Sequence, residues 1–367
     1  MRKIILTVCA VIMAGSTSAF AFDVKTDVQQ EFPNFKISGW LKVAYLDTLY
    51  HDTLVTYPSG FEVKDAAITV SGDAWSDLAY RICLQSNKPT KASASTVYAA
   101  WLLDAYADWK PSKLYSFRVG QYKRPFGYEQ LTAATSMDFV NASQITGKFN
   151  SSNREQGIMG FGVWRDLSYF LSLGNGAPYN EKDANPSKTV LFRIVYAPLA
   201  GMTVGGSVEY GTQNTAGKSY YNRHVGLDVN YEWGKLFARG EYMIGQDDKA
   251  MTTDSVLVGT TMVTQSGVDM NLMRGGYLTV GYVPLSKLKV NVRRDVYREN
   301  CQWGLITDGI SSWWNKKESR VIVFNLGADY FLNPNTKVTL NYDITQEDMA
   351  LRPVKNNPLS AQLQVKF

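Results

Sequence analysis

The sequence predicts an all-β fold, a transmembrane antiparallel up-and-down barrel of about sixteen strands. Three observations predict this fold. Apolar and polar residues alternate along most of the chain, the connections between alternating segments are short and long in turn, and aromatic residues gather beside the short connections. Strands that face hydrocarbon must pair all their backbone groups within the protein, so such a sheet is expected to close on itself.

The alternation is clearest at the C-terminus. Leu359, Leu363 and Phe367 point to one face of an extended chain, and Gln362 and Lys366 point to the other. The same pattern recurs in roughly sixteen segments, with bounds uncertain by about 2–4 residues. They lie near residues 35–47, 61–73, 77–86, 96–109, 113–122, 156–165, 168–174, 189–198, 202–211, 221–232, 235–245, 271–283, 288–298, 320–332, 336–346 and 358–367. An even number of strands returns the chain to its starting side.

Every second connection between these segments is very short. Examples are Trp75-Ser76, Arg165-Asp166-Leu167, Trp233-Gly234 and Asn333-Pro334-Asn335, whereas the connections between them are long and polar. Short periplasmic turns and long external loops are typical of outer-membrane barrels. A soluble sandwich has no physical reason to sort its loops by length.

Aromatic residues support the same fold. Those at the short-turn ends of the segments are Trp109, Trp164, Tyr196, Trp233, Tyr282, Phe331 and Phe367. A belt of aromatic side chains at the membrane interface predicts this placement. An alternative is that aromatic residues are common in any strand.

The composition argues against a bundle of membrane-spanning helices, because 45% of the 367 residues are apolar and the mean hydropathy is −0.20. The one long apolar run, Ile4 to Gly15, is too short to cross a bilayer as a helix. It follows Arg2-Lys3 and leads to Ala19-Phe20-Ala21, so residues 1–21 are expected to be a signal peptide. Residues 22–34 would then form a periplasmic segment that plugs, anchors or trails, and residues 35–367 the barrel.

Charge and residue usage exclude several function classes. Without Arg2 and Lys3 the net charge is +3 (38 − 2 − 33), which is too balanced for a nucleic-acid-binding protein. Cys83 and Cys301 remain after the signal peptide, and the sequence leaves their pairing open. The sequence has two histidines, His51 and His224, and so offers few imidazole ligands for a metal site. We therefore expect no metal, no cofactor and no catalytic residues.

Three segments of the first third resemble a known family. They are Gly60-Phe61-Glu62-Val63-Lys64-Asp65-Ala66, then Leu103-Asp104-Ala105-Tyr106-Ala107-Asp108-Trp109-Lys110-Pro111, and Val119-Gly120-Gln121-Tyr122-Lys123-Arg124-Pro125-Phe126-Gly127-Tyr128-Glu129. They are similar to the phosphate-selective porins O and P. The resemblance implies a sixteen-stranded barrel, commonly a homotrimer, whose third long loop folds into the pore. It also implies anion transport past basic residues, with a lysine at the narrowest point.

The third long loop is expected over about residues 123–155 and to fold inward. Lys123 matches the position where the family carries its lysine, so we predict that Lys123 contacts anions; the adjacent Arg124 departs from the family pattern. Pro125 and Gly127 suit the sharp bend into the loop. The complete set of basic residues predicted for the constriction is Lys123, Arg124, Arg118, Lys148 and Arg154. Glu129, Asp138 and Glu155 oppose them.

The alternation also predicts which charged residues line the lumen. The basic ones are Lys36, Lys42, Arg81, Arg118, Arg193, Arg239, Lys289, Arg293, Lys337 and Lys366. The acidic ones are Asp65, Asp104, Asp108, Glu209, Asp228, Glu232, Glu241, Asp295, Asp329 and Asp343. A dedicated anion channel would show a sharper basic excess, and many of these charges are expected to pair across neighbouring strands.

The leading hypothesis is a passive diffusion channel in outer-membrane lipid for inorganic anions or small hydrophilic solutes, with a preference for anions such as phosphate. The balanced lumen keeps a general or cation-preferring porin as the alternative. An outer-membrane barrel enzyme is a third reading, but neither histidine falls in a recognisable nucleophile motif.

Overall fold

The computed structural model describes residues 32–50, 59–86, 90–92, 95–97, 100–149, 153–183, 186–215, 218–250, 255–258, 261–264, 268–299, 303–307, 312–316, 319–348, 353–354 and 357–367. The expected signal peptide, His51 and Cys301 lie outside these ranges, and so does most of the segment 22–34. Within these ranges, no helix has the length and apolar character needed to cross a bilayer.

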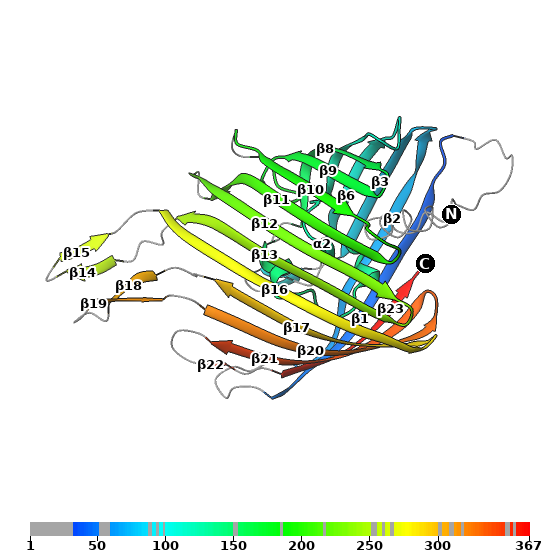
Figure 1. The fold of residues 1–367 in the computed structure, drawn as a ribbon. Coiled ribbons are helices and arrows are strands. Elements are labelled where there is room, and N and C mark those ends of the chain that lie inside the picture. Colours follow the sequence, from blue (N-terminus) through cyan, green and yellow to red (C-terminus); the bar gives the residue numbers. More distant parts are fainter. Residues whose placement is uncertain are drawn as a thin grey trace.

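The chain forms a closed antiparallel barrel of 16 strands (Figure 1). Each strand pairs with the next along the chain, and the first strand pairs with the last, so that β1 residues such as Leu41 lie opposite β23 residues such as Val365. The barrel strands are β1 (Lys36–Tyr50), β2 (Gly60–Trp75), β3 (Leu78–Ser86), β6 (Ala100–Trp109), β7 (Ser116–Lys123), β8 (Arg154–Trp164), β9 (Leu167–Gly174), β10 (Thr189–Tyr196), β11 (Met202–Thr215), β12 (Lys218–Trp233), β13 (Leu236–Ala250), β16 (Val268–Leu285), β17 (Leu288–Glu299), β20 (Ser319–Asn333), β21 (Thr336–Asp348) and β23 (Asn357–Lys366).

The predicted fold class is confirmed, and each predicted segment overlaps one barrel strand. The strands of the second half run further toward the long-loop end than the sequence predicts. The long connections also contain short elements that the sequence analysis missed: β4 (Thr90–Ala92), β5 (Ser95–Val97), β14 (Ser255–Val258), β15 (Thr261–Thr264), β18 (Trp303–Thr307), β19 (Ser312–Lys316) and β22 (Pro353–Val354). The first six pair as three hairpins outside the barrel sheet.

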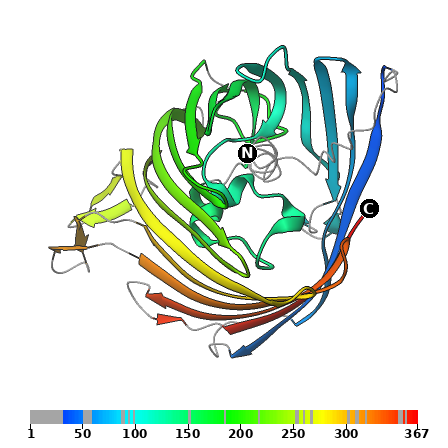
Figure 2. The ribbon, with the colours of Figure 1, turned by 45° about the vertical axis from the view of Figure 1, so that its right-hand side comes forward.

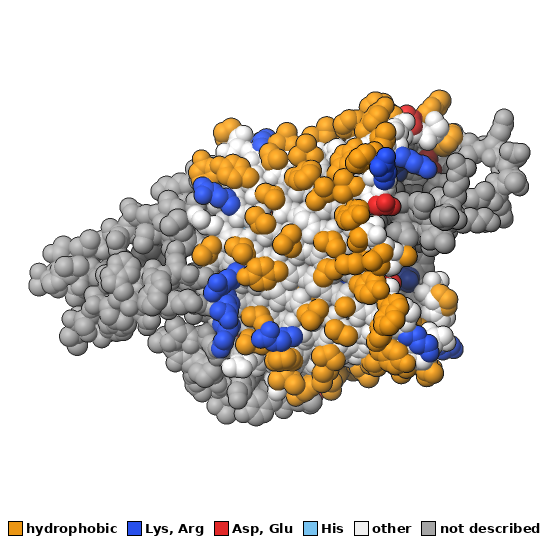
Figure 3. All heavy atoms as spheres, in the orientation of Figure 1, with side chains coloured by type: hydrophobic (Ala, Val, Ile, Leu, Met, Phe, Trp, Pro, Cys, Tyr) orange, Lys and Arg blue, Asp and Glu red, His pale blue; other side chains and the backbone are white. Residues whose placement is uncertain are grey.

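The two faces of each strand differ as the alternation predicts. On β10, Leu191 and Arg193 are buried in the barrel interior, whereas Phe192 and Ile194 are exposed on the outside. The outer surface is accordingly covered with apolar side chains (Figure 3). Of the predicted aromatic belt, Trp109, Trp164, Tyr196, Trp233, Tyr282 and Phe367 are exposed at the short-turn end.

The connection between β7 and β8 lies within the ring of strands (Figure 2). It contains three short helices: α2 (Tyr128–Leu131), the 3-10 helix η1 (Ala134–Ser136) and α3 (Gln144–Phe149). We call residues 124–153 the third loop. Because this segment occupies the interior of a wide barrel, its contacts with the wall determine which lumen side chains remain open to a passing solute.

Candidate functional site: the interior of the barrel

The third loop leaves β7 through a bend that a glycine makes possible. Gly127 has a φ of 77°, in the left-handed region that favours glycine. A Cβ atom at this position would lie 2.5 Å from the Glu241 carboxylate, so that carboxylate would have to move to accept any other residue. Arg124, just before the bend, pairs with Glu209 and lies 3.8 Å from Glu155. The start of the loop is therefore fixed by backbone geometry and by a buried charge pair.

Carboxylates of the wall accept hydrogen bonds from the loop backbone. Glu241 on β13 accepts the amide of Tyr128 at 3.0 Å and the hydroxyl of Tyr277 at 2.7 Å. Asp295 on β17 accepts the amide of Gln144, the first residue of α3, at 2.6 Å. These bonds satisfy helix N-terminal donors that would otherwise be buried without partners.

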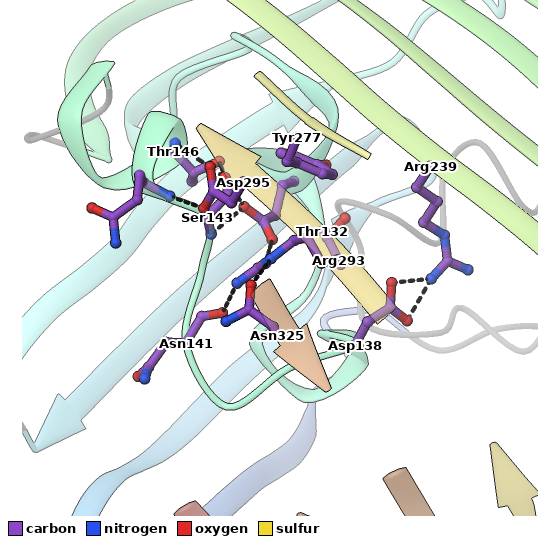
Figure 4. Close-up of polar contacts among 12 residues, drawn as sticks. Thr132, Asp138, Asn141, Ser143, Thr146, Arg239, Tyr277, Arg293, Asp295 and Asn325 are labelled. Carbon is purple, nitrogen blue, oxygen red and sulfur yellow. Dashed lines mark hydrogen bonds and ion pairs between the residues drawn. The ribbon is translucent and has the colours of Figure 1, made fainter. Parts of the chain in front are cut away.

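Arg293 on β17 holds the middle of the loop (Figure 4). Its guanidinium group donates to Glu129 at 3.0 Å, to Asn325 at 2.8 Å and to the carbonyl of Asn141 at 3.2 Å. Glu129 in turn accepts the amide of Ser143 at 2.8 Å. One arginine thus ties two parts of the loop, around Glu129 and Asn141, to the wall.

Asp138 is a second anchor, in the stretch between η1 and α3. It pairs with Arg239 (Figure 4) and with Lys289, the latter at 3.1 Å. Burial raises the pKa of this carboxyl, but the two cations outweigh burial and leave the pKa below its ordinary value. The neighbouring carbonyl of Met137 accepts a hydrogen bond from Lys337 at 2.9 Å. Asp138 therefore stays ionised and paired at neutral pH.

The loop also packs by apolar contact. Phe126 from the bend and Ile145 and Phe149 from α3 join a buried cluster with the wall residues Leu191, Met243, Met273, Tyr277 and Tyr297. These wall residues occupy inward positions, where an open lumen would favour polar side chains. These residues were not predicted from the sequence, although an apolar residue at a predicted inward position indicates that another segment of the chain covers the wall.

We call the part of the barrel wall formed by β12, β13, β16, β17 and β20 the anchoring wall.

A group of basic residues lies on other strands, where the loop begins. Lys123 at the end of β7 is directly opposite Arg154 on β8. Arg154, Arg81 and Lys42 lie near enough to Lys123 for their positive charges to repel its ammonium. We call these four residues, Lys42, Arg81, Lys123 and Arg154, the basic group.

Two carboxylates lie among the basic group. Lys42 is 3.1 Å from Asp65. Arg81 and Arg154 share Asp104, at 3.2 and 3.1 Å. Among the described residues, the four cations of this group outnumber the two carboxylates that they contact. An excess of this kind acts at short range in a narrow, poorly screened passage.

Lys123 also binds the backbone of the third loop. Its ammonium donates to the carbonyl of Gln130 at 3.0 Å and to the carbonyl of Thr132 at 2.7 Å. An ammonium has three donors, so these bonds hold the loop while the charge remains part of the basic group. Sequence reasoning predicts the charge of Lys123 but not this positioning role.

The other residues predicted for the constriction lie apart from one another. Arg118 near the short-turn end of β7 makes a two-bond pair with Asp108, at 2.6 and 2.9 Å, and its guanidinium lies 3.8 Å from the centre of the Tyr106 ring. Lys148 on α3 is half-exposed and 3.8 Å from Glu299. Of the five predicted residues, the structure brings Lys123 and Arg154 together.

Five predicted lumen cations of the second half pair with carboxylates, namely Arg193, Arg239, Lys289, Arg293 and Lys337. Arg193 is 2.6 Å from Asp228, and Lys289 is 2.5 Å from Asp329. Arg239 and Arg293 bind the third loop, as described above. The buried His224 lies between Glu209 and Asp247, at 3.3 and 2.8 Å. The described residues contain no cluster suited to hold a metal ion.

Solved structures with the same fold are channels of the outer membrane. The chain aligns with the outer membrane channel DcaP of Acinetobacter baumannii at a TM-score of 0.63, with 9% identity over 91% of this chain and 97% of that one. An anion-selective porin from Comamonas acidovorans aligns at 0.61, with 11% identity over 91% and 99%. OmpT of Vibrio cholerae in its trimer form aligns at 0.63, with 9% identity over 91% and 99%.

No curated protein matches the sequence. The profile of one family, the phosphate-selective porins O and P, matches residues 35–232, which is more than half of the chain. The family description and the printed names of the structural neighbours are those of porins and outer-membrane channels. The chain therefore belongs to the phosphate-selective porin O and P family.

Proposed function

We propose that this outer-membrane channel passes small hydrophilic solutes by diffusion and favours anions such as phosphate, and that the basic group carries the preference. The observation behind the proposal is the local excess of cations over carboxylates where the third loop leaves β7. Elsewhere in the described lumen, Arg193, Lys289 and Arg293 pair with wall or loop carboxylates. Because their fields are largely offset, we expect the net charge of the basic group to decide the sign of the preferred ion.

Transport requires weak binding, because a solute held too tightly does not leave. Lys123 is a point charge with part of its donor capacity already used by loop carbonyls. Arg81 and Arg154 likewise share one carboxylate. A hydrated oxyanion would contact several donors that already bind other groups of the protein. Such donors are expected to bind the anion only weakly and briefly.

The experiment is the reversal potential of single channels in a planar bilayer under a KCl gradient. Wild type is expected to prefer chloride and to lose current when phosphate is added. Arg81→Gln and Lys123→Gln are expected to reduce both effects. Arg81→Gln changes the charge without touching the loop carbonyls, so agreement between the two variants separates the charge of Lys123 from its positioning role.

Arg118→Gln is the matched control. It removes the same charge from the lumen, but from a pair with Asp108 near the short-turn end, where Lys110 also lies 3.8 Å from Asp108. An equal loss of anion preference in Arg118→Gln would mean that total lumen charge, and not the basic group, sets selectivity. A neutral or cation-preferring wild type would contradict the proposal as a whole.

A general or cation-preferring porin is the second candidate, and one observation favours it. On the anchoring wall, Glu241 lies near Asp228 and near the loop residue Glu129, and Asp295 also lies near Glu129. If permeating ions reach these carboxylates, they oppose the basic group. The same reversal-potential measurement decides between the candidates by the sign of its result.

We also propose that the barrels assemble as a homotrimer. The support is the family and the trimer form of the Vibrio cholerae OmpT structure. Conductance steps that occur in threes, together with a trimeric mass in mild detergent, are the expected result. A single monomeric species with one conductance level would contradict this proposal.

A further inference from the structure

A cavity of about 230 Å³ lies between the third loop and the strands β17, β20, β21 and β23. Its charged lining residues are the carboxylates Asp295, Asp343 and Glu347 and one cation, Arg293. The loop residue Asn141 also lines the cavity and is exposed, so the cavity can be reached from the lumen. One water molecule needs roughly 10–15 Å³ of such space, so a small organic solute can enter. We call this space the acidic cavity.

The cations at the acidic cavity do not balance its carboxylates. Arg293 is already bound to Glu129 and to the carbonyl of Asn141 (Figure 4). Lys64 lies near enough to Asp343 for its charge to act on that carboxylate, and its ammonium donates to the Asn141 side chain at 2.7 Å. With Glu129 included, four carboxylates of the described residues therefore face two cations here.

The carboxylates of the acidic cavity also keep hydrogen-bonding capacity. Asp295 is 1% exposed, and its Oδ2 accepts the amide of Gln144 at 2.6 Å. Its Oδ1 has no hydrogen-bond partner among the described residues. Asp343 accepts from Asn325 at 2.7 Å with one of its two oxygens, and Glu347 is partly exposed. Buried acceptors without donors are costly, so a donor from a bound solute would stabilise this arrangement.

The spacing of these carboxylates indicates the shape of the ligand. Asp343 and Glu347 are four residues apart on one face of β21, which places their backbones about 13 Å apart. Asp295 is opposite Val323, and Val323 is opposite Thr345 on β21, so Asp295 lies two strands away. Side chains stand roughly perpendicular to a sheet, so the three carboxylates stay apart from one another. Accordingly, the described residues contain no acidic group suited to a metal ion.

We propose that the acidic cavity binds a small organic solute that has two ammonium groups joined by a short alkyl chain. Each ammonium has three N–H donors, which bind carboxylates at about 2.7–2.9 Å. Two positive charges balance the excess of carboxylates, and the lining residues Val323 and Pro358 would contact the alkyl chain. A divalent metal ion has the same charge but cannot span separate carboxylates. The proposal concerns other strands than the basic group and does not depend on the anion preference proposed above.

The test is ligand binding to the folded barrel in detergent, measured by saturation-transfer NMR at constant ionic strength. The probe is putrescine, a butane chain with an amine at each end, and butylamine is the comparison with a single amine. The variants are Glu347→Gln and Asp343→Asn/Glu347→Gln. The matched control is Glu232→Gln, which removes one lumen glutamate from a pair with Arg239 at the short-turn end. Heat-modifiable migration confirms that each barrel is folded.

Wild type is expected to bind putrescine about tenfold more tightly than butylamine, because the second ammonium adds a charge-assisted contact. Glu347→Gln should remove most of this difference, the double variant should remove all of it, and the control should bind as wild type does. Equal binding of the two amines, equal loss in the control, or full displacement by an equal concentration of magnesium chloride would each overturn the proposal. If the double variant does not fold, Glu347→Gln decides alone, because its residue is partly exposed. The assay measures binding and not current, so its result is separate from the reversal-potential measurement.

Discussion

The basic group and the anchoring wall are built from the same kinds of residue, but their carboxylates have different partners. In the basic group, Asp104 accepts from two guanidinium groups, on Arg81 and Arg154. In the anchoring wall, Glu241 and Asp295 accept backbone amides of the third loop. A carboxylate that is used by backbone amides holds structure, whereas cations that outnumber their carboxylates leave charge for a solute. Counting charges along the chain cannot separate these two uses.

Of the substitutions considered, the removal of Arg293 is expected to weaken the docking of the third loop on the anchoring wall the most. In Arg293→Met, Glu129 loses its cation while its side chain is only 10% exposed. We expect a loss of about 3–5 kcal/mol in the stability of the docked loop, the usual effect of breaking a buried ion pair. Single-channel current should become larger and noisier. Arg118→Met, which breaks a pair that does not touch the loop, should leave the current steady; equal noise in both variants would contradict the anchoring role.

Phe149→Ala tests the apolar part of the same anchor. Phe149 is 2% exposed and packs with Tyr297 and His224. We expect about 3 kcal/mol of lost loop stability from the cavity that the substitution creates. Protease sensitivity of the third loop should rise while the barrel stays intact. Phe117→Ala, on the lipid-facing surface, is the matched control and should leave the loop resistant to protease.

Acid should weaken the ion pairs that hold Asp138 to the wall. We expect this to destabilise the docked loop less than the two substitutions above do. Because the folded-state pKa of Asp138 is lowered by Arg239 and Lys289, its ion pairs stabilise the loop above the unfolded pKa of about 3.9. That contribution is lost as the pH falls through the lowered folded-state pKa. Current noise should be flat from about pH 8 to pH 5 and should increase below about pH 4. In Asp138→Asn the current noise should already be raised at neutral pH, and it should not increase further when the pH is lowered.

Glu241→Gln should have the smallest effect on selectivity and sharpens the comparison most directly. Glu241 is buried and accepts bonds from Tyr128 and Tyr277. Loss of these charge-assisted bonds should destabilise the loop by about 1–3 kcal/mol. The reversal potential should stay close to the wild-type value. A clear shift toward anions would show that permeating ions reach the anchoring wall and would favour the second candidate function.

Much of the barrel could be predicted from the sequence, because each strand carries its own evidence. The alternation of Leu359, Leu363 and Phe367 with Gln362 and Lys366 specifies two faces without reference to any neighbour. The short turns and the aromatic residues beside them specify one end of the barrel. The hairpins β4–β5, β14–β15 and β18–β19 escaped prediction because their strands have only three to five residues each, too few to show an alternating pattern.

The candidate site was predicted only in part. Lys123 and Arg154 could be placed near each other because they flank one loop. Lys42 and Arg81 come from strands about 40–110 residues earlier, and the pairing of the intervening strands β2 and β6 brings them near. The inward Met243, Met273 and Tyr297 had a readable signal, an apolar residue at a lumen position. That signal was outweighed by the regular alternation around it.

The sequence by itself determined the strands, their inward and outward faces, and the position at which the chain turns into the lumen, because these depend on residues next to one another along the chain. Tertiary structure alone decided which carboxylate partners which cation, where the loop docks, and where like charges meet on adjacent strands. Those outcomes depend on strand register and on contacts between residues far apart in the chain. Electrostatic energy depends on distance in space, and local sequence pattern does not specify that distance.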